Sequence, residues 1–223
     1  MSDATYLAFD IGANCGRKTW AMRQLGAKVV AVDPLLAFQS EFVPEFFWRW
    51  SEDPMVLPVA RAVSTERTVE LAINRFMPYV SSTDKNWMTK SAHAPKFKQP
   101  YYVETSLIRR KVQGITLDAL INVYGSPRFM KVDVEGAEDL VMGTLSQPVP
   151  AFNMEFHQDW IPTRAIRHME AMGTYIWNYA LGNQGQFVLV DWVTSKQLLA
   201  YLKQHLTKDG NGSWGDIYGW LVE

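Results

Sequence analysis

The sequence lacks most of the features that would place a chain in a specialised class. Among 223 residues there is one cysteine, Cys15, which excludes an internal disulfide framework and a cysteine-rich zinc site. No apolar run approaches the ~20 residues that a membrane-spanning helix needs, and Met1–Thr5 lacks the basic and apolar regions of a signal peptide. The formal net charge is −1, so no global basic field points to duplex nucleic acid. We therefore expect a cytoplasmic protein without a membrane or nucleic-acid partner.

Composition and length describe an ordinary globular chain. Hydrophobic residues make up 48% of the sequence and charged residues 20%, a balance that allows a substantial core and excludes disorder as the main state. The length suits one α/β domain over residues 1–223. Aromatic residues around 46–48 and 214–220 permit a dimer without requiring one, so the oligomeric state stays open.

Apolar runs bounded by turn residues predict an alternation of strands and helices. Strands are expected at residues 5–10, 28–32, 56–63, 69–73, 112–115, 128–134, 151–156, 174–180, 186–191 and 216–222. Helices are expected at residues 17–25, 116–122, 138–145, 162–172 and 195–206. A strand, a glycine turn, a helix and a strand at the start of the chain imply a parallel sheet. Residues 66–112 interrupt this regularity, and we interpret them as an inserted, lid-like segment of the same domain.

The turn after the first strand has the composition of a ligand-binding loop. Gly12 and Gly16 let a ligand approach the backbone, and the following helix offers unpaired N–H groups and a positive dipole end. Asp33 ends the second strand, 21 residues after Gly12, where a carboxylate can accept from both hydroxyls of a ribose. The dinucleotide spacing G-x-G-x-x-G fails, because Asn14 and Arg17 stand where glycines are needed. NAD, FAD and a nucleotide-dependent oxidoreductase are therefore disfavoured.

Three stretches of the sequence resemble a known family. The first motif of class I methyltransferases, which bind S-adenosylmethionine, is similar to Phe9-Asp10-Ile11-Gly12-Ala13-Asn14-Cys15-Gly16. The FkbM family of methyltransferases closely resembles Gly114-Ile115-Thr116-Leu117-Asp118-Ala119-Leu120-Ile121, followed by Phe129-Met130-Lys131-Val132-Asp133-Val134-Glu135-Gly136-Ala137-Glu138 and Gly143. Its C-terminus is similar to Trp214-Gly215-Asp216-Ile217-Tyr218. The resemblance implies a Rossmann-like, doubly wound and mostly parallel sheet of seven strands with an antiparallel last strand.

The same resemblance implies roles for individual residues. The methionine and ribose part of S-adenosylmethionine would contact Asp10, Gly12, Asn14 and Gly16, and the ribose hydroxyls would contact Asp33. The adenine would lie near Ala62 and Val63, and Asp133 would face the methionine amino end or the methyl group. Structural alternatives stay open: a turn role for Asp10 and Asp33, a special backbone angle for Gly136, a helix-dipole role for Glu138 and a packing role for Cys15.

Ionisable side chains follow the central strands, where a hydroxyl acceptor would need a base. Glu155 and His157 lie two apart on a strand and so point to one face, and histidine is the side chain best suited to base work near neutral pH. The candidate catalytic residues are therefore His157, Asp133 and Glu155, although His157 can instead be a structural, hydrogen-bonded histidine. The same residues with Glu135 can gather a divalent metal, but they lack a fixed ligand spacing, so no metal site is predicted.

The inserted segment carries a local excess of positive charge. Between residues 85 and 111, Glu104 opposes seven basic residues, a local charge of +6, and these are Lys85, Lys90, Lys96, Lys98, Arg109, Arg110 and Lys111. We interpret this stretch as a lid that favours an anionic acceptor, with a solvated loop as the alternative.

The residues and the resemblance together predict an S-adenosylmethionine-dependent methyltransferase. Its acceptor is expected to be a hydroxyl on a small molecule, sugar or natural product. No Asn-Pro-Pro-Tyr-type sequence follows the fourth strand, where Asp133-Val134-Glu135-Gly136 stands instead, and this argues against methylation of nucleic-acid bases. The alternative is a protein that binds S-adenosylmethionine without transferring the methyl group and serves as a scaffold or regulator.

Overall fold

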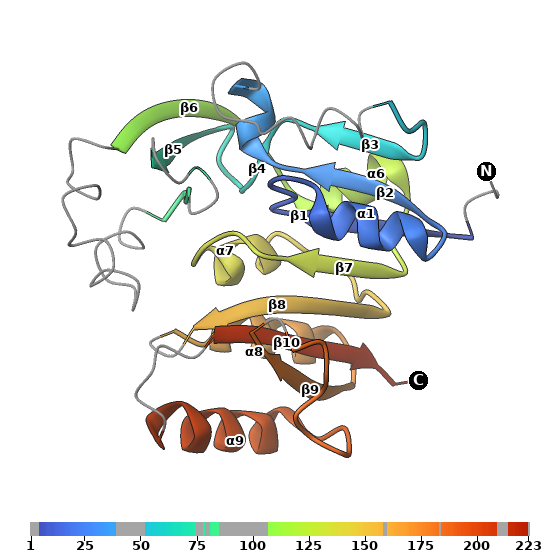
Figure 1. Ribbon diagram of the computed structural model, residues 1–223, viewed down its shortest axis with the longest axis vertical. Coiled ribbons are helices and arrows are strands. Elements are labelled where there is room, and N and C mark those ends of the chain that lie inside the picture. Colours follow the sequence, from blue (N-terminus) through green and yellow to red (C-terminus); the bar gives the residue numbers. More distant parts are fainter. Residues whose placement is uncertain are drawn as a thin grey trace.

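A seven-stranded sheet forms the centre of the computed structural model, which describes residues 5–38, 52–74, 78, 81–84, 107–157, 160–182, 184–208 and 214–222 (Figure 1). The strands are β1 (Tyr6–Ile11), β2 (Ala27–Val32), β3 (Val56–Val59), β7 (Phe129–Val132), β8 (Ala151–His157), β9 (Tyr175–Leu181) and β10 (Trp214–Leu221). Their order is β3-β2-β1-β7-β8-β10-β9, and among them β10 alone runs antiparallel to its neighbours. The predicted Rossmann-like sheet with an antiparallel last strand is confirmed.

The strand order reverses between β1 and β7. The chain places β2 and β3 on one side of β1 and then returns to place β7 on the other side. Both neighbours of β1 are parallel to it, and Asp10 pairs with Ala31 of β2 and with Lys131 of β7. In open α/β sheets, connections that leave such a point in opposite directions open a crevice at the carboxyl ends of the strands. The topology therefore puts a crevice beside the glycine turn.

Alternate residues of β1 face opposite layers of the molecule. Ala8 packs with Met22 of α1 (Arg17–Gln24) on one face of the sheet. Phe9 and Ile11 join the large core on the other face, which also contains residues from α6 (Leu117–Tyr124), α7 (Glu138–Met142), α8 (Thr163–Met172) and α9 (Ser195–Lys208). Figure 1 shows α1 in front of the strands and α6 behind them. Burial on both faces explains why apolar residues fill the central strands almost continuously.

Local side chains set the helix ends near the crevice. Thr116 is the N-cap of α6, and its Oγ1 accepts a hydrogen bond from the Ala119 N at 3.0 Å. The helix α7 is shorter than predicted, because Thr144 Oγ1 donates to the Val141 carbonyl at 2.8 Å and accepts from the Leu117 N at 2.9 Å. These bonds tie the end of α7 to the start of α6. No helix in the described part of the chain has both the length and the apolarity to cross a membrane.

A second sheet of three strands lies next to the first and contains the two ends of the inserted segment. Its strands are β4 (Ala62–Val63), β5 (Thr68–Asn74) and β6 (Leu107–Ile115), in the order β4-β6-β5. The predicted single strand over 56–63 is wrong in extent, because β3 and β4 belong to different sheets. The Arg61 N donates to the Val59 carbonyl at 2.9 Å, and this turn redirects the chain between the two strands.

The predicted strand over residues 186–191 is wrong. In the described residues this region meets β9 only at isolated bridges, Ala180 with Phe187 and Trp177 with Val193. The side chain of Asn178 takes the backbone groups of Leu189, because its Nδ2 donates to the carbonyl at 3.0 Å and its Oδ1 accepts from the N at 3.2 Å. A side-chain amide thus replaces the partner that a neighbouring strand would have supplied.

Candidate functional site

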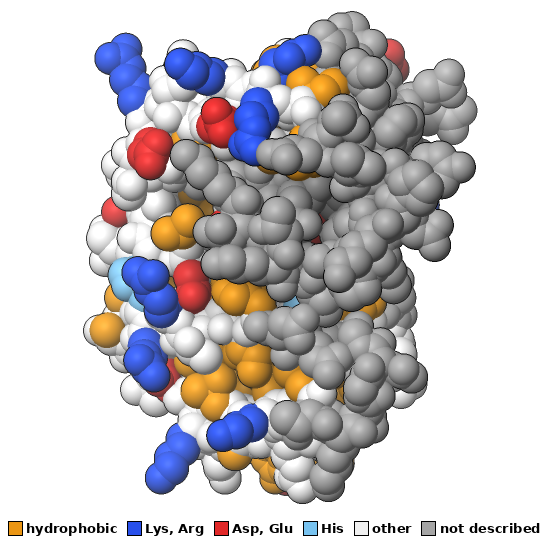
Figure 2. Space-filling view, turned by 90° about the vertical axis from the view of Figure 1, so that its left-hand side faces the viewer, with side chains coloured by type: hydrophobic (Ala, Val, Ile, Leu, Met, Phe, Trp, Pro, Cys, Tyr) orange, Lys and Arg blue, Asp and Glu red, His pale blue; other side chains and the backbone are white. Residues whose placement is uncertain are grey.

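A cavity opens at the carboxyl ends of the strands, next to the point where their order reverses. The residues predicted for cofactor binding that line it are Gly12, Asn14, Asp33, Ala62, Val63 and Asp133. They come from the turn after β1, the end of β2, strand β4 and the loop after β7, so the fold brings together what the sequence separates. Figure 2 looks onto this edge of the sheet, and on its described part charged side chains of both signs stand among hydrophobic ones.

Asp33 is held in a fixed orientation at the cavity wall. Its Oδ2 accepts from the backbone N of Asn14 and its Oδ1 accepts from the backbone N of Leu35, both at 2.8 Å. The residue is 6% exposed, and burial raises the pKa of its carboxyl although both N–H donors oppose the shift. Because each carboxylate oxygen has a second lone pair, Asp33 can accept from two further hydroxyls.

The turn from β1 to α1 is built from left-handed residues. Gly12 and Gly16 both have a φ of 77°, and Asn14 has a φ of 49°. A Cβ on Gly12 would lie 1.7 Å from the carbonyl oxygen of Asp133, so close packing against the loop after β7 also requires glycine there. Gly16 is the N-cap of α1 and is not among the described residues that line the cavity.

Lys131 is a site residue that the sequence reasoning missed. It lies on β7, is 4% exposed and borders the cavity. Its Nζ donates to the carbonyl of Gly12 at 2.9 Å and lies 3.1 Å from Oδ2 of Asp133 and 3.6 Å from Oδ1 of Asp10. Burial alone would lower the pKa of Lys131, but the carboxylates of Asp133 and Asp10 outweigh burial and raise it. A lysine inside an apolar strand was the signal that could have identified it.

Asp10 stands behind the cavity wall. Its side chain is fully buried and accepts a hydrogen bond from the hydroxyl of Thr19 on α1. Burial raises the pKa of Asp10, and the nearby Lys131 counteracts that shift. Asp10 therefore acts on the site by holding Lys131 and the start of α1, and it is not among the described residues that line the cavity.

The remaining lining residues give the cavity an apolar part and a cationic part. The apolar part includes Leu35, Leu71 and Val141 beside Ala62 and Val63. The cationic part consists of Lys131 together with Arg17 and Lys18, the first residues of α1, and the sequence did not single out these two. Basic residues at a helix N-terminus oppose the helix dipole, and this unfavourable placement was the available signal that they serve a ligand.

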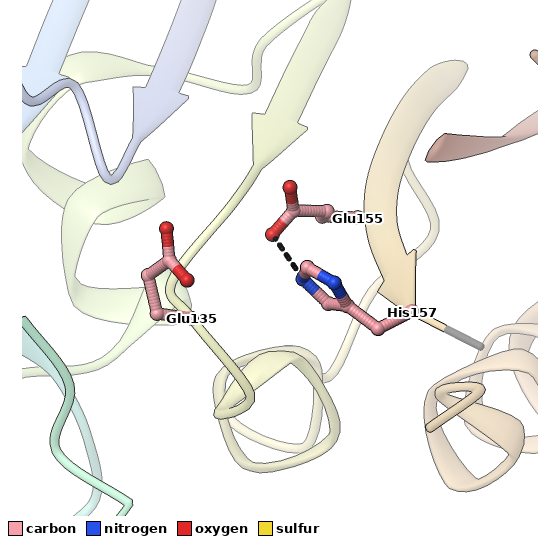
Figure 3. Close-up of side chains that lie close together, drawn as sticks. All are labelled: Glu135, Glu155 and His157. Carbon is pink, nitrogen blue, oxygen red and sulfur yellow. Dashed lines mark hydrogen bonds and ion pairs between the residues drawn. The ribbon is translucent and has the colours of Figure 1, made fainter. Parts of the chain in front are cut away.

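Glu155 and His157 form a buried pair on β8, as their spacing predicted. Figure 3 shows them together with Glu135, which projects from the loop after β7 toward the same space. The Nε2 of His157 lies 3.0 Å from Oε2 of Glu155, and the two residues are 5% and 8% exposed. Burial, followed by the carboxylates of Asp133 and Glu135, raises the pKa of Glu155 well above its ordinary value. Neither residue of the pair is among the described residues that line the cavity.

The loop after β7 is held in an unusual conformation. Glu135 has a φ of 54° and Gly136 a φ of 93°, so two consecutive residues are left-handed. Gly136 thus has the special backbone angle that its sequence position suggested. The Ser82 hydroxyl, from the inserted segment, donates to the Glu135 carbonyl at 2.7 Å and fastens the strained loop.

Glu138 lies in the first turn of α7, where the sequence predicted an acid that interacts with the helix dipole. Its carboxyl is fully buried, however, and Oε1 accepts from the backbone N of Val134 at 2.9 Å. Burial raises the pKa of Glu138 to about 8. The side chain therefore lies in the protein interior and not at a solvated helix end.

Comparisons with known proteins yield solved structures of similar fold. No protein-family model matches the chain, and no curated protein matches it significantly. One similar structure is a precorrin-6y C5,15-methyltransferase from Geobacter metallireducens, with a TM-score of 0.48, 9% identity and coverage of 99% of this chain and 82% of the other. Another is an rRNA methylase from Streptococcus thermophilus, with a TM-score of 0.42, 8% identity and coverage of 99% and 87%. A third is a 16S rRNA (adenine(1408)-N(1))-methyltransferase from Catenulisporales acidiphilia with cosubstrate SAM, with a TM-score of 0.41, 13% identity and coverage of 99% and 88%.

Proposed function

We propose that this protein is an S-adenosylmethionine-dependent methyltransferase, related to the FkbM family, that methylates a hydroxyl of a small molecule, sugar or natural product. The observation that carries the proposal is the geometry of Asp33. A carboxylate fixed by two backbone N–H groups borders a cavity at the switch point of the sheet. A ribose diol donates two hydrogen bonds to such a group, and the neighbouring Ala62 and Val63 offer an apolar surface for adenine.

The charges around the cavity fit the other end of the same cofactor. S-adenosylmethionine carries a carboxylate, an ammonium and a sulfonium, and when bound it supplies an activated methyl group. Arg17 and Lys18 can pair with the carboxylate, and Asp133 and Glu135 can face the cationic groups. Lys131 orients this wall because it binds both Asp133 and the carbonyl of Gly12.

His157 is the candidate base for an acceptor hydroxyl, because a ring nitrogen lies within 4.8 Å of a carboxylate oxygen of Glu135, which lines the cavity. A hydroxyl that accepts a methyl group must release its proton, and a positioned base contributes about 10²–10⁴-fold to such a step. Glu155 orients the His157 ring through their 3.0 Å contact and stabilises the imidazolium once the ring has taken the proton. In this role His157 is the catalytic base and Glu155 is a positioning residue, while Asp133 borders the reacting groups.

The inserted segment supports a lid role through its described ends. Ser82 fastens the loop that carries Glu135, and Ser81 and Thr83 line the cavity. The predicted basic residues between 85 and 98 lie outside the described residues, and Arg109 forms an exposed ion pair with Glu70 at 2.9 Å. The preference for an anionic acceptor therefore rests on the charge of the segment.

Burial of the base favours one alternative function. Because His157 and Glu155 are nearly buried and lie outside the described cavity lining, the chain could bind the cofactor without reaching an acceptor. A regulatory S-adenosylmethionine-binding protein would show cofactor binding but no methyl transfer and no slow hydrolysis of the cofactor.

A thermal-shift experiment tests the proposed cofactor against the dinucleotides. S-adenosylhomocysteine should raise the melting temperature of the full chain in a concentration-dependent way, because a ligand that binds the folded state stabilises it. NADH should leave the melting temperature unchanged. A shift with NADH and none with S-adenosylhomocysteine would overturn the proposal and revive the oxidoreductase.

A further inference from the structure

Three carboxyl groups from separate elements converge beside the cavity. Asp133 follows β7, Glu138 lies on α7 and Glu155 lies on β8, and one carboxyl oxygen of each lies within 4.8 Å of the other two. A cation with oxygen ligands at about 2.3–2.6 Å places opposed ligands roughly 4.6–5.2 Å apart. The three groups therefore stand at separations that a single hard cation can bridge.

Glu138 gives an independent indication that something binds here. The residue is 0% exposed, and its Oε1 is occupied by the backbone N of Val134. Its Oε2 is buried and has no hydrogen-bond partner among the residues that the structure describes. A buried carboxyl oxygen without a partner is costly, and a cation bound at this atom would remove that cost.

The cations in the described part of the chain do not balance these carboxylates. Lys131 contacts both Asp10 and Asp133, so its single charge is already shared. Glu155 uses Oε2 for His157, which leaves Oε1 for another partner. Within the described ranges, no lysine or arginine forms an ion pair with Glu138 or Glu155. The region therefore holds more carboxyl groups than described cations that could balance them when ionised.

We propose that Asp133, Glu138 and Glu155 bind one divalent cation of the hard class, which comprises Mg²⁺, Mn²⁺ and Ca²⁺. An all-oxygen ligand set favours these ions over softer metals. Glu135 and His157 also have ligand atoms within 4.8 Å of one from Glu155, so they stand next to the proposed ion. The role of Glu138 as a ligand differs from the expectation from sequence, because its position in the sequence is that of an ordinary acid at a helix N-terminus.

The position of the site allows a bound cation to contribute to the proposed methyl transfer. Asp133 both belongs to the carboxylate group and lines the cavity, so a cation bound there can also hold an acceptor oxygen. A bound cation stabilises the negative charge that develops when a hydroxyl loses its proton. This consequence rests on the proposed methyl transfer, whereas the cation site itself does not.

Binding of Mn²⁺ to the full chain tests the site without cofactor or acceptor. Electron paramagnetic resonance measures free Mn²⁺ during a titration at pH 7.5, with Ca²⁺ and Mg²⁺ as competitors. We expect one Mn²⁺ per chain and at least tenfold weaker binding by Glu138→Gln, which removes the charge but keeps an oxygen for the Val134 N. The matched control is Glu170→Gln on the exposed face of α8, which should bind like the wild type.

Two results would overturn the cation site. One is the absence of Mn²⁺ binding by wild-type protein shown to be folded by circular dichroism, which would mean that protons neutralise the cluster. The other is equal binding by the wild type and Glu138→Gln. If Glu138→Gln fails to fold, Glu155→Gln replaces it with the same expectation. A titration with S-adenosylhomocysteine, run separately, distinguishes failure of this site from failure of the proposed function.

Discussion

The two sides of the crevice bury their carboxylates in different ways. On the side of β1 and β2, Asp33 accepts from two backbone N–H groups. Asp10 accepts from the Thr19 hydroxyl, and its Oδ1, which has no described hydrogen-bond partner, forms an ion pair with Lys131 at 3.6 Å. On the side of β7 and β8, Oε2 of Glu138 has no described hydrogen-bond partner, and Glu155 has a single contact with His157. The described residues thus hold both carboxyl groups of the first side in place, as a rigid cofactor site requires. The second side depends on protons, a cation or an acceptor for its charge balance.

The largest effect is expected where the two sides touch. Gly12→Ala should cost more than about 4 kcal/mol or prevent folding, because a Cβ would lie 1.7 Å from the Asp133 carbonyl in a left-handed residue. Chemical denaturation followed by circular dichroism measures the loss.

Gly185→Ala is the matched control for that substitution. Gly185 also has a positive φ, of 66°, but nothing lies within 4 Å of an added Cβ, so only about 1 kcal/mol should be lost. Equal losses for the two variants would mean that backbone conformation, and not the contact between the two sides, makes Gly12 necessary.

The next largest effect concerns the lysine that links the two sides. Lys131→Met should destabilise the protein by about 3–5 kcal/mol, because it leaves the buried Asp10 without its cation. Urea unfolding of Lys131→Met, Asp10→Asn and the double variant forms a cycle in which the double variant loses less than the sum of the single losses. Additive losses would show that Lys131 and Asp10 act independently.

A third effect should appear in catalysis and not in cofactor binding. His157→Gln is expected to lower turnover about 10²–10⁴-fold, the usual contribution of a general base, with unchanged affinity for S-adenosylhomocysteine. The backbone bonds between His157 and Trp160, both at 2.9 Å, do not use the ring and should keep the strand end in place.

His168→Gln serves as the control for the base. Its ring contacts the carbonyl of Leu145 at 2.7 Å, in the core layer behind the sheet, so it should leave turnover unchanged. A full rate in His157→Gln, measured with any hydroxyl acceptor that supports turnover, would assign His157 a purely structural role.

The smallest effect is the pH dependence of cofactor affinity through Asp33. Burial raises the pKa of Asp33 above 3.8, so its protonation, and the accompanying loss of affinity for S-adenosylhomocysteine, should begin at a higher pH than for an exposed aspartate. In the cofactor-free protein the sign is opposite: the raised pKa adds stability below 3.8, and this contribution is lost as the pH rises through the folded value. Asp33→Asn should remove both dependences in calorimetric and unfolding measurements.

The side of the crevice formed by β1 and β2 was also the predictable side. A strand, a turn with Gly12 and Gly16, a helix and Asp33 after the next strand are local patterns, and each carries its own geometric requirement. The N-cap at Thr116 was predictable for the same reason, because it depends on residues three positions apart. Local rules therefore sufficed for the elements that position the proposed cofactor.

The side formed by β7 and β8 depends on contacts between residues that lie far apart in the sequence. The hydrogen bond from Lys131 to the Gly12 carbonyl joins residues that lie 119 positions apart. The burial of Glu138 depends on how α7 packs. The predicted strand over 186–191 was wrong because Asn178 takes the backbone of Leu189. The alternation of apolar residues there does not reveal such a partner.

Calorimetric titration of S-adenosylhomocysteine into the wild type, Asp33→Ala and Asp53→Ala tests the central claim most directly. Asp53 is the matched control, because its Oδ1 accepts from the Met55 N at 2.9 Å just as Asp33 accepts from the Leu35 N, yet Asp53 is not among the described residues that line the cavity. We predict binding by the wild type and Asp53→Ala, and a loss of at least tenfold in Asp33→Ala. Absence of binding in folded wild-type protein, or equal affinity in Asp33→Ala, would contradict the assignment of the cavity to S-adenosylmethionine.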